Sequence, residues 1–78
     1  MQHGIAMQHA MAVLKAERVQ KGLSLSAMKE RTGIERSTLA RLENNAEANP
    51  TVNTLTRYAD AVGKKVLVVL ADADEGEA

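Results

Sequence analysis

The chain of 78 residues contains no cysteine. Disulfide bonds and thiolate metal sites are therefore excluded, and cysteine usage says nothing about an oxidising compartment. No apolar run is long enough to span a bilayer. The opening, MQHGIAMQHAM, is not a basic region followed by a leucine-rich signal core, so we expect a cytoplasmic protein with no membrane partner. A chain of this length forms one small domain, whose single core is marginally stable without a partner chain.

The sequence also lacks a net charge, because its ten basic residues balance its ten acidic residues. Four of the acidic residues lie within the last seven positions, which contain no lysine or arginine. Residues 1–71 consequently hold ten basic and six acidic residues, a formal net charge of +4. This charge is modest for a nucleic-acid-binding protein. We therefore expect affinity to depend on a dimer that presents two copies of the binding surface.

Side-chain combinations typical of catalytic or metal sites are scarce. His3 and His9 have no further ligands at a usual metal spacing, and Ser24 and Ser26 have no base within a recognisable catalytic motif. Tyr58 is the only aromatic residue and falls on an apolar helical stripe, which favours core packing over base stacking. We therefore predict that the protein is not an enzyme and holds neither metal nor cofactor.

The most informative pattern lies in residues 24–44, which read as two short helices joined at Gly33. Ser24 is suited to cap the first helix, and Gly33 tolerates the left-handed backbone at which a helix can end. In the second helix Leu39 and Leu42 point to one side. At about 100° per residue, the opposite arc of roughly 140° holds five small or polar residues: Arg36, Ser37, Ala40, Arg41 and Asn44.

This polar face matches what the edges of base pairs require. Arginine can contact guanine through two hydrogen bonds, serine and asparagine can bond to bases or phosphates, and alanine can touch a thymine methyl group. The alternative interpretation is a solvated helix face with no ligand. The short preceding helix and the glycine turn favour a DNA-binding helix-turn-helix.

Periodicity predicts two further helices. The first spans residues 5–21, and its candidate buried residues are Met7, Ala10, Met11, Leu14 and Val19. Residues 44–50 are rich in asparagine and end in proline, which predicts a loop. The other helix begins after a Thr51 cap and ends at Gly63, with an apolar stripe of Val52, Leu55, Tyr58, Ala59 and Val62. Residues 1–63 are therefore expected to form the DNA-binding domain.

Residues 64–71 read as a dimerisation strand. Their central part is rich in β-branched residues and does not alternate between polar and apolar: Val66, Leu67, Val68, Val69 and Leu70. A lone strand leaves backbone groups unpaired, and the sequence shows no second strand. The simplest solution is pairing with the same strand of a second copy in a homodimer. The alternative is a terminal helical turn packed on the core. Residues 72–78 are expected to form a flexible acidic tail.

Several of these motifs together resemble a known family. GLSL at residues 22–25, RTGI at 31–34 and RSTLARLEN at 36–44 resemble the helix-turn-helix of the Cro and phage-repressor (XRE) family. NPT at residues 49–51 and the following helix resemble a subset that includes HigA-like and HipB-like antitoxins. The resemblance covers roughly residues 10–70. With the strand, it predicts an all-α, lambda-repressor-like bundle of four to five helices whose C-terminal β-strand pairs across a homodimer.

The resemblance implies that the helix of residues 36–44 enters the major groove, and that two subunits read a palindrome about one helical turn apart. It assigns base reading to Arg36, Ser37 and Arg41, and a position near bases or phosphates to Glu35 and Thr38. Contacts with the DNA backbone are implied at both ends of the motif, at Leu25, Ser26, Asn44 and Asn45.

The family pattern also pairs an arginine of the first helix with a late glutamate, here Arg18 and Glu43. Two positions depart from the pattern. Lys29 replaces a small alanine, so either its side chain extends outward or the two helices sit differently. Glu35 replaces a small polar cap, and its charge faces phosphates unless it bonds a cytosine amine or the helix N-terminus.

These features predict a sequence-specific DNA-binding transcriptional repressor. We expect an antitoxin-like autoregulator that binds a palindromic operator as a dimer. The expected partners are double-stranded DNA and a second copy of the chain, with a cognate toxin as a further candidate. The alternative is a protein-interaction module, toxin-neutralising or other, that uses the fold without reading DNA.

Overall fold

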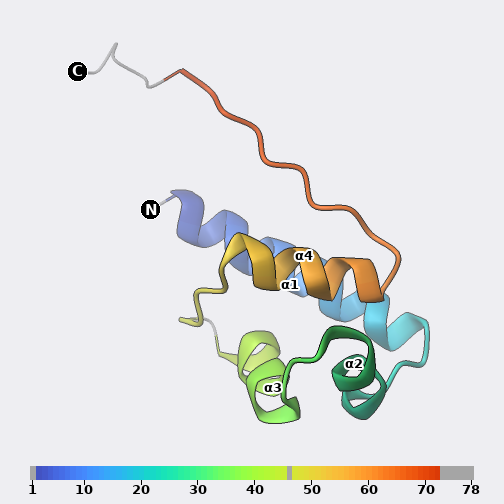
Figure 1. The fold of residues 1–78 in the computed structure, drawn as a ribbon. Coiled ribbons are helices and arrows are strands. Elements are labelled where there is room, and N and C mark those ends of the chain that lie inside the picture. The colour runs from blue at the N-terminus through green and yellow to red at the C-terminus, as the bar shows by residue number, and fades with distance from the viewer. Residues whose placement is uncertain (1, 46, 73–78) are drawn as a thin grey trace.

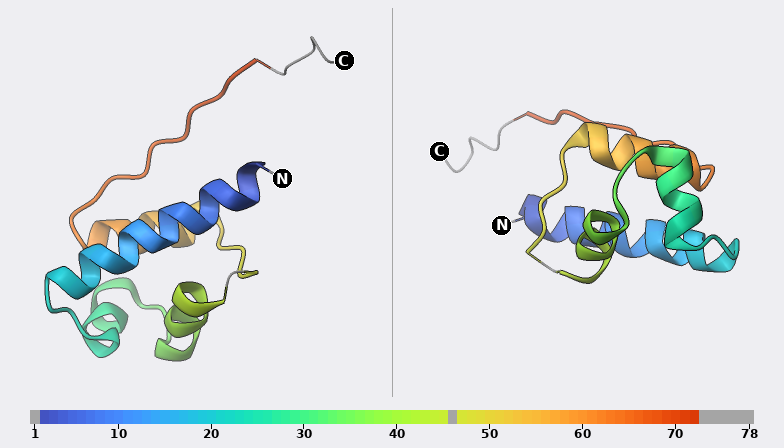
Figure 2. Two further views of the ribbon diagram at one scale, coloured as in Figure 1. Left: turned by 180° about the vertical axis from the view of Figure 1, so that it is seen from behind. Right: turned by 60° about the horizontal axis from the view of Figure 1, so that its bottom comes forward.

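The computed structural model describes residues 2–45 and 47–72, with side chains from residue 9 onward. These residues form four helices: α1 (Gln2–Gln20), α2 (Leu25–Thr32), α3 (Arg36–Asn44) and α4 (Val52–Ala61). In Figure 1, α1 runs behind α4, and the shorter α2 and α3 lie beneath this pair. The views in Figure 2 show the same arrangement from behind and from below. The prediction of an all-α helix-turn-helix fold is confirmed, with four helices in the described ranges.

The ends of the short helices form as the sequence predicts. Ser24 caps α2 by accepting a hydrogen bond from the backbone N–H of Ala27 at 3.0 Å, and Thr51 caps α4 by accepting from that of Thr54 at 3.1 Å. Gly33 ends α2 with a φ of 77°, a left-handed conformation that disfavours other residues. The buried hydroxyl of Thr32 accepts from the N–H of Ile34 at 3.0 Å, which fixes the turn into α3.

All four helices contribute to one apolar core. Its largest fully buried side chains come from α2, α3 and α4 and from the end of α4: Met28, Leu39, Tyr58 and Val62. The remaining members are Met11, Leu14, Ile34, Leu42, Leu55, Ala59 and Ala61. Leu39 and Leu42 are the inward side of α3, so its polar face is directed away from the bundle.

A buried ionic network joins α1, α3 and α4. Arg18 of α1 holds the Glu43 carboxylate of α3 with two hydrogen bonds of 2.8 Å, from Nε to Oε2 and from Nη2 to Oε1. Its third nitrogen, Nη1, donates to the carbonyl oxygen of Leu23 at 2.8 Å. The Tyr58 hydroxyl of α4 donates to the same carboxylate. The Glu43 side chain is only 2% exposed, so its charge depends on these donors. The predicted pair of Arg18 with Glu43 is confirmed.

The network also fixes which groups carry charge. Burial raises the pKa of the Tyr58 hydroxyl above its usual range, and its hydrogen bond to Glu43 adds to the increase. Tyr58 therefore remains a neutral donor at physiological pH. The hydrogen bond with Glu43 also raises the pKa of the Arg18 guanidinium, which remains a cation.

The structure corrects three details of the helix predictions. Helix α1 spans Gln2–Gln20, rather than residues 5–21, and the predicted core side chain Met7 lies outside the described side chains. Val19 is 59% exposed, because the inward face of α1 runs through Met11, Leu14 and Arg18. Val52 is 54% exposed, because it begins α4, one turn before the helix becomes buried.

The predicted C-terminal strand does not form within the single described chain. Residues 64–72 run as an extended segment away from the end of α4, and above α1 and α4 in Figure 1. No described segment lies beside them to supply a ladder of hydrogen bonds. The alternative, a terminal helical turn, does not form there either. Residues 73–78, most of the predicted acidic tail, lie outside the described residues.

The buried network predicts a large loss of stability when Glu43 is removed. Glu43→Ala leaves the Arg18 cation and the Tyr58 hydroxyl without their acceptor, so the free energy of unfolding falls by about 3–5 kcal/mol. Urea denaturation followed by circular dichroism measures this loss. Glu47→Ala is the control, because Glu47 is exposed. A loss below about 1 kcal/mol for Glu43→Ala, the size seen for exposed pairs, contradicts this account.

Candidate nucleic-acid interface

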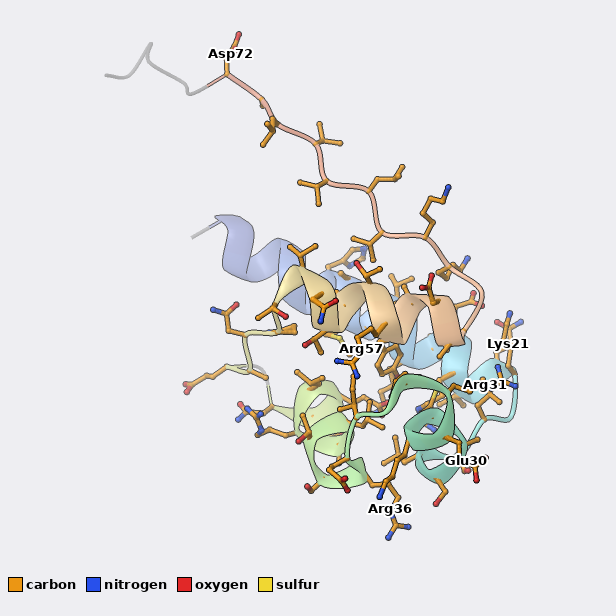
Figure 3. The ribbon with its side chains drawn as sticks, viewed as in Figure 1. Lys21, Glu30, Arg31, Arg36, Arg57 and Asp72 are labelled. Carbon is orange, nitrogen blue, oxygen red and sulfur yellow. The ribbon has the colours of Figure 1, made fainter. Side chains whose placement is uncertain are left out.

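The start of α2 and the start of α3 meet at one surface. Arg36, the first residue of α3, donates from Nη1 to the Ser26 hydroxyl of α2 at 3.2 Å, and both residues are exposed. Leu25, the first residue of α2, is half-buried against the core. Figure 3 shows Arg36 at the lower end of the molecule, pointing away from α1 and α4. The two helix starts and their backbone N–H groups therefore lie next to an exposed guanidinium group.

The outer face of α3 carries the side chains expected to read DNA. Arg36, Ser37 and Arg41 are exposed. Thr38 and Ala40 are half-buried at the edges of this face. Because the leucines on the opposite side are anchored in the core, the exposed face has one fixed orientation.

Lys29 and Glu35 form an exposed ion pair beside this face. Lys29 Nζ lies 3.0 Å from Glu35 Oε1, and the two side chains are 46% and 68% exposed. Of the two explanations for Lys29, an outward side chain is therefore the one observed. Glu35 occupies the cap position of α3, but its side chain makes no capping hydrogen bond. The negative charge of the Glu35 carboxylate would repel a DNA phosphate if no basic group lay beside it. Lys29 supplies such a group.

The end of α3 is held by polar contacts. Asn44 Oδ1 accepts a hydrogen bond from Lys15 of α1 at 3.2 Å. Asn45 Oδ1 accepts from the backbone N–H of Glu47 at 2.8 Å, which forms a turn directly after α3. Lys15 is a basic residue that the sequence reasoning did not place here. It lies 29 positions from Asn44, and no local pattern connects the two.

Two arginines missed by the sequence reasoning hold the frame of the motif. Arg57 of α4 donates from Nη2 to the carbonyl oxygen of Thr32 at 2.6 Å. Arg31 of α2 donates from Nη1 to the carbonyl oxygen of Ala61 at 2.8 Å. In Figure 3 Arg57 lies between α4 and the turn from α2 to α3. Both bonds satisfy carbonyl groups at helix ends, so these arginines position α2 against α4.

The described residues contain neither a cluster of metal ligands nor a membrane-spanning helix. In residues 2–45 and 47–72, no three histidine, aspartate or glutamate side chains gather closely enough to hold a metal ion. The helices of that part of the chain are also too short or too polar to cross a membrane. His9 is exposed on α1, and the side chain of His3 lies outside the described side chains.

Comparison with known proteins agrees with this geometry. The helix-turn-helix family matches residues 14–68, which include α2, α3, α4 and the turns between them. The chain belongs to this family. It is the Cro and phage-repressor (XRE) type that the sequence resembles. Family membership also supports the prediction that the protein is not an enzyme. The antitoxin subset receives no support from the match.

The relatives include two regulators from bacilli. The chain is 33% identical over 64 residues to the HTH-type transcriptional regulator SinR of Bacillus licheniformis, covering 82% of this chain and 58% of that protein. It is 31% identical over 64 residues to SinR of Bacillus subtilis (strain 168), with the same coverage of 82% and 58%. The chain therefore spans less than two thirds of the length of these relatives. No solved structure gives a significant match.

The geometry at the start of α3 predicts that Glu35→Ser stabilises the protein. Serine at this position can accept a hydrogen bond from the exposed N–H groups of α3, which adds about 0.5–1 kcal/mol to the free energy of unfolding. Glu30→Ser makes the same change of charge on an exposed residue within α2 and provides no cap. Urea denaturation compares the two variants with the natural protein. Equal or lower stability for Glu35→Ser would contradict the expected gain, and would show that a serine cap does not outweigh the lost ion pair with Lys29.

Proposed function

We propose that this protein is a sequence-specific DNA-binding transcriptional repressor that binds a palindromic operator as a homodimer in the cytoplasm. In this proposal residues 1–63 are the DNA-binding domain, residues 64–71 the dimerisation strand and residues 72–78 an acidic tail. Helix α3 enters the major groove, and the start of α2 and the end of α3 meet the DNA backbone on either side.

The main support for the proposal is the set of side chains on the outer face of α3. This face is exposed, carries Arg36, Ser37 and Arg41, and is held at a fixed angle by the buried Glu43 on its inner side. Arginine is the side chain that most often recognises guanine, and two arginines lie within the exposed arc of this short helix. The family match and the SinR relatives, which are HTH-type transcriptional regulators, support the same proposal.

The proposed contacts divide the interface into two kinds. Arg36, Ser37 and Arg41 read base edges, with Glu35 and Thr38 beside them. Contacts with the DNA backbone come from Leu25, Ser26, Asn44 and Asn45. The hydrogen bond from Arg36 to Ser26 supports this division, because it places a proposed base-reading side chain next to a proposed phosphate contact. Ser26 can therefore orient the guanidinium group before DNA arrives.

A more specific version of this proposal is an antitoxin-like role, in which the repressor also binds a protein partner. The exposed apolar residues of the C-terminal segment offer a surface for a protein partner, including a cognate toxin. The same surface favours the second candidate function, a protein-interaction module that does not read DNA. Selection of duplexes from a random pool separates the two, because only a DNA reader recovers a shared sequence at moderate salt.

Replacing either arginine of α3 tests base reading. On the selected duplex, Arg36→Ala and Arg41→Ala should each lose about 1–3 kcal/mol of binding free energy and relax the preference at one base pair. Fluorescence anisotropy on the selected duplex and on its single-base variants measures both effects. An equal loss on all duplexes would instead show that the arginine contacts only phosphates.

Two variants serve as controls for this test. Arg41→Lys keeps the positive charge but cannot form the two parallel hydrogen bonds, so it should lose sequence preference while retaining non-specific affinity. Gln20→Ala shortens an exposed, uncharged side chain at the end of α1 and should bind as the natural protein does.

Removing the C-terminal segment tests the proposed dimer. A chain that ends at Lys65 should keep its helical circular dichroism spectrum, because ten of the eleven residues of the buried core precede position 62 and the eleventh is Val62 itself. It should sediment as a monomer at concentrations where the full chain is a dimer, and its affinity for the palindrome should fall by tenfold or more, since each half-site is then bound independently. An unchanged dimer would refute pairing through this segment.

A further inference from the structure

Residues 66–70 form an apolar segment that the helical bundle leaves uncovered. Leu67, Val69 and Leu70 are 77%, 83% and 92% exposed. Only Val66 is half-buried and packs against the core. Within the described part of the chain, no backbone group of residues 65–72 takes part in a hydrogen bond. An extended apolar segment with unpaired backbone groups is a template for another strand.

A groove lies where this segment leaves the bundle. Val66 lines it together with Val13 and Leu14 of α1 and with Leu55 and Ala59 of α4. Val13 is 43% exposed there, although it is a large apolar residue on a packed helix. Figure 1 shows this segment above α1 and α4. A second strand can therefore approach the segment on the side of the bundle where it leaves α4.

We propose that the same segment of a second copy occupies this surface, running antiparallel with Val68 at the twofold axis. The inference rests on the dimer of the proposed function, and adds the register of the pairing and the residues that set it. Three independent features select this register.

Symmetry is the first feature. When a twofold axis relates two neighbouring antiparallel strands, the axis is perpendicular to the sheet. Residue number n therefore lies on the same face of the sheet in both copies. Directly opposed residues in an antiparallel pair also share a face, so the numbers of two opposed residues must have an even sum. Registers centred on Leu67, Val68 or Val69 meet this condition, whereas registers centred between two residues do not.

Apolar overlap is the second feature. In the register centred on Val68, residues 66–70 of one copy lie opposite residues 66–70 of the other. Val66 then lies opposite the partner's Leu70. Centred on Val69, Val66 lies opposite the partner's Asp72. Centred on Leu67, Lys65 lies opposite the partner's Val69. Each shift therefore places a charged residue opposite a large apolar one, which disfavours it, whereas the register centred on Val68 places only Lys65 opposite the small Ala71 of the partner.

Charge is the third feature. In the register centred on Val68, Lys64 lies opposite the partner's Asp72. Lys64 Nζ is 3.5 Å from Glu17 Oε2, and Lys21 Nζ is 3.2 Å from Glu17 Oε1. Two cations thus surround one carboxylate, and the neighbouring lysine contacts hold the pKa of Glu17 below its ordinary value. The partner's Asp72 neutralises the remaining positive charge of this cluster.

The same register fills the apolar groove. The partner's Leu70 lies opposite Val66 and on the same face, with the two Cβ atoms about 5 Å apart. Because Val66 faces the groove, the partner's leucine covers the exposed Val13 beside it. Twofold symmetry repeats this contact on the second copy, so Leu70, the most exposed large apolar residue among the described side chains, becomes buried in the other copy.

Single cysteines test the register directly, because the natural chain has none. In Val68→Cys the two thiols face each other at a Cα separation of about 4.5–5.5 Å, which suits a disulfide. In Leu67→Cys and in Val69→Cys the two thiols are offset along the strands beyond the limit of about 7 Å. Under mild oxidation, Val68→Cys should form a covalent dimer at least tenfold faster than the other two variants. Non-reducing electrophoresis follows the reaction, and circular dichroism confirms that each variant keeps its helices.

Faster cross-linking of Leu67→Cys or Val69→Cys would overturn this register, and slow cross-linking of all three would overturn strand pairing. Neither outcome depends on DNA. A cross-linked Val68→Cys dimer that selects no duplex sequence would support the register while refuting the proposed function. A protein that binds a palindrome but resists cross-linking at position 68 would overturn the register alone.

A charge reversal at Asp72 tests the proposed ion pair between Lys64 and the partner's Asp72. Asp72→Lys places like charges together at both ends of the paired strands and should raise the dimer dissociation constant by about threefold to tenfold at low salt. The double variant Lys64→Ala with Asp72→Lys removes the like-charge contact without placing a second carboxylate beside Glu17, so it should recover the natural constant to within about threefold. Sedimentation equilibrium measures both constants. A double variant as weak as Asp72→Lys would overturn the pairing of Lys64 with the partner's Asp72.

Discussion

The placement of α3 depends on the buried carboxylate of Glu43. Helix α3 has nine residues, a length at which an isolated helix is unstable in water, so its position must come from contacts with the rest of the protein. Arg18 and Tyr58 bring α1 and α4 to the same carboxylate, which is 2% exposed. An uncompensated charge there would be costly, so α3 must keep an orientation in which Glu43 reaches Arg18 and Tyr58. The inner side of α3 is thereby fixed, and with it the direction of its outer face.

The five arginines of the chain divide between this frame and the proposed DNA-binding surface. Arg18, Arg31 and Arg57 donate to buried or helix-end acceptors within the bundle. Arg36 and Arg41 remain exposed on α3. A count of basic residues therefore overstates the number of arginine side chains that one copy can offer to DNA. This division supports the proposal that a second copy, joined through residues 64–72, contributes to DNA binding.

Much of the fold was predictable from the sequence because its signals are local. The caps at Ser24 and Thr51, the turn at Gly33 and the two faces of α3 follow from residue type and helical spacing. The pairing of Arg18 with Glu43 came from the family resemblance. The bonds of Lys15 to Asn44 and of Arg57 to Thr32 join residues 29 and 25 positions apart, and no local spacing reveals them. Val19 was predicted as buried because hydrophobicity alone does not show that Arg18 takes the inward position. The strand stays a prediction, since its hydrogen bonds require a second chain.

The most direct test of the central claim is nuclear magnetic resonance of the isotope-labelled protein, titrated with a duplex selected from a random pool. If the outer face of α3 reads DNA, the largest shifts of backbone amide signals should fall at the start of α2 and at residues 35–45. Arg36 and Arg41 side-chain signals should move with them, and α1 should change little on the face that packs against α4. Shifts confined to residues 64–72 and the adjacent groove, with α3 unperturbed, would contradict the account and indicate a protein-interaction module.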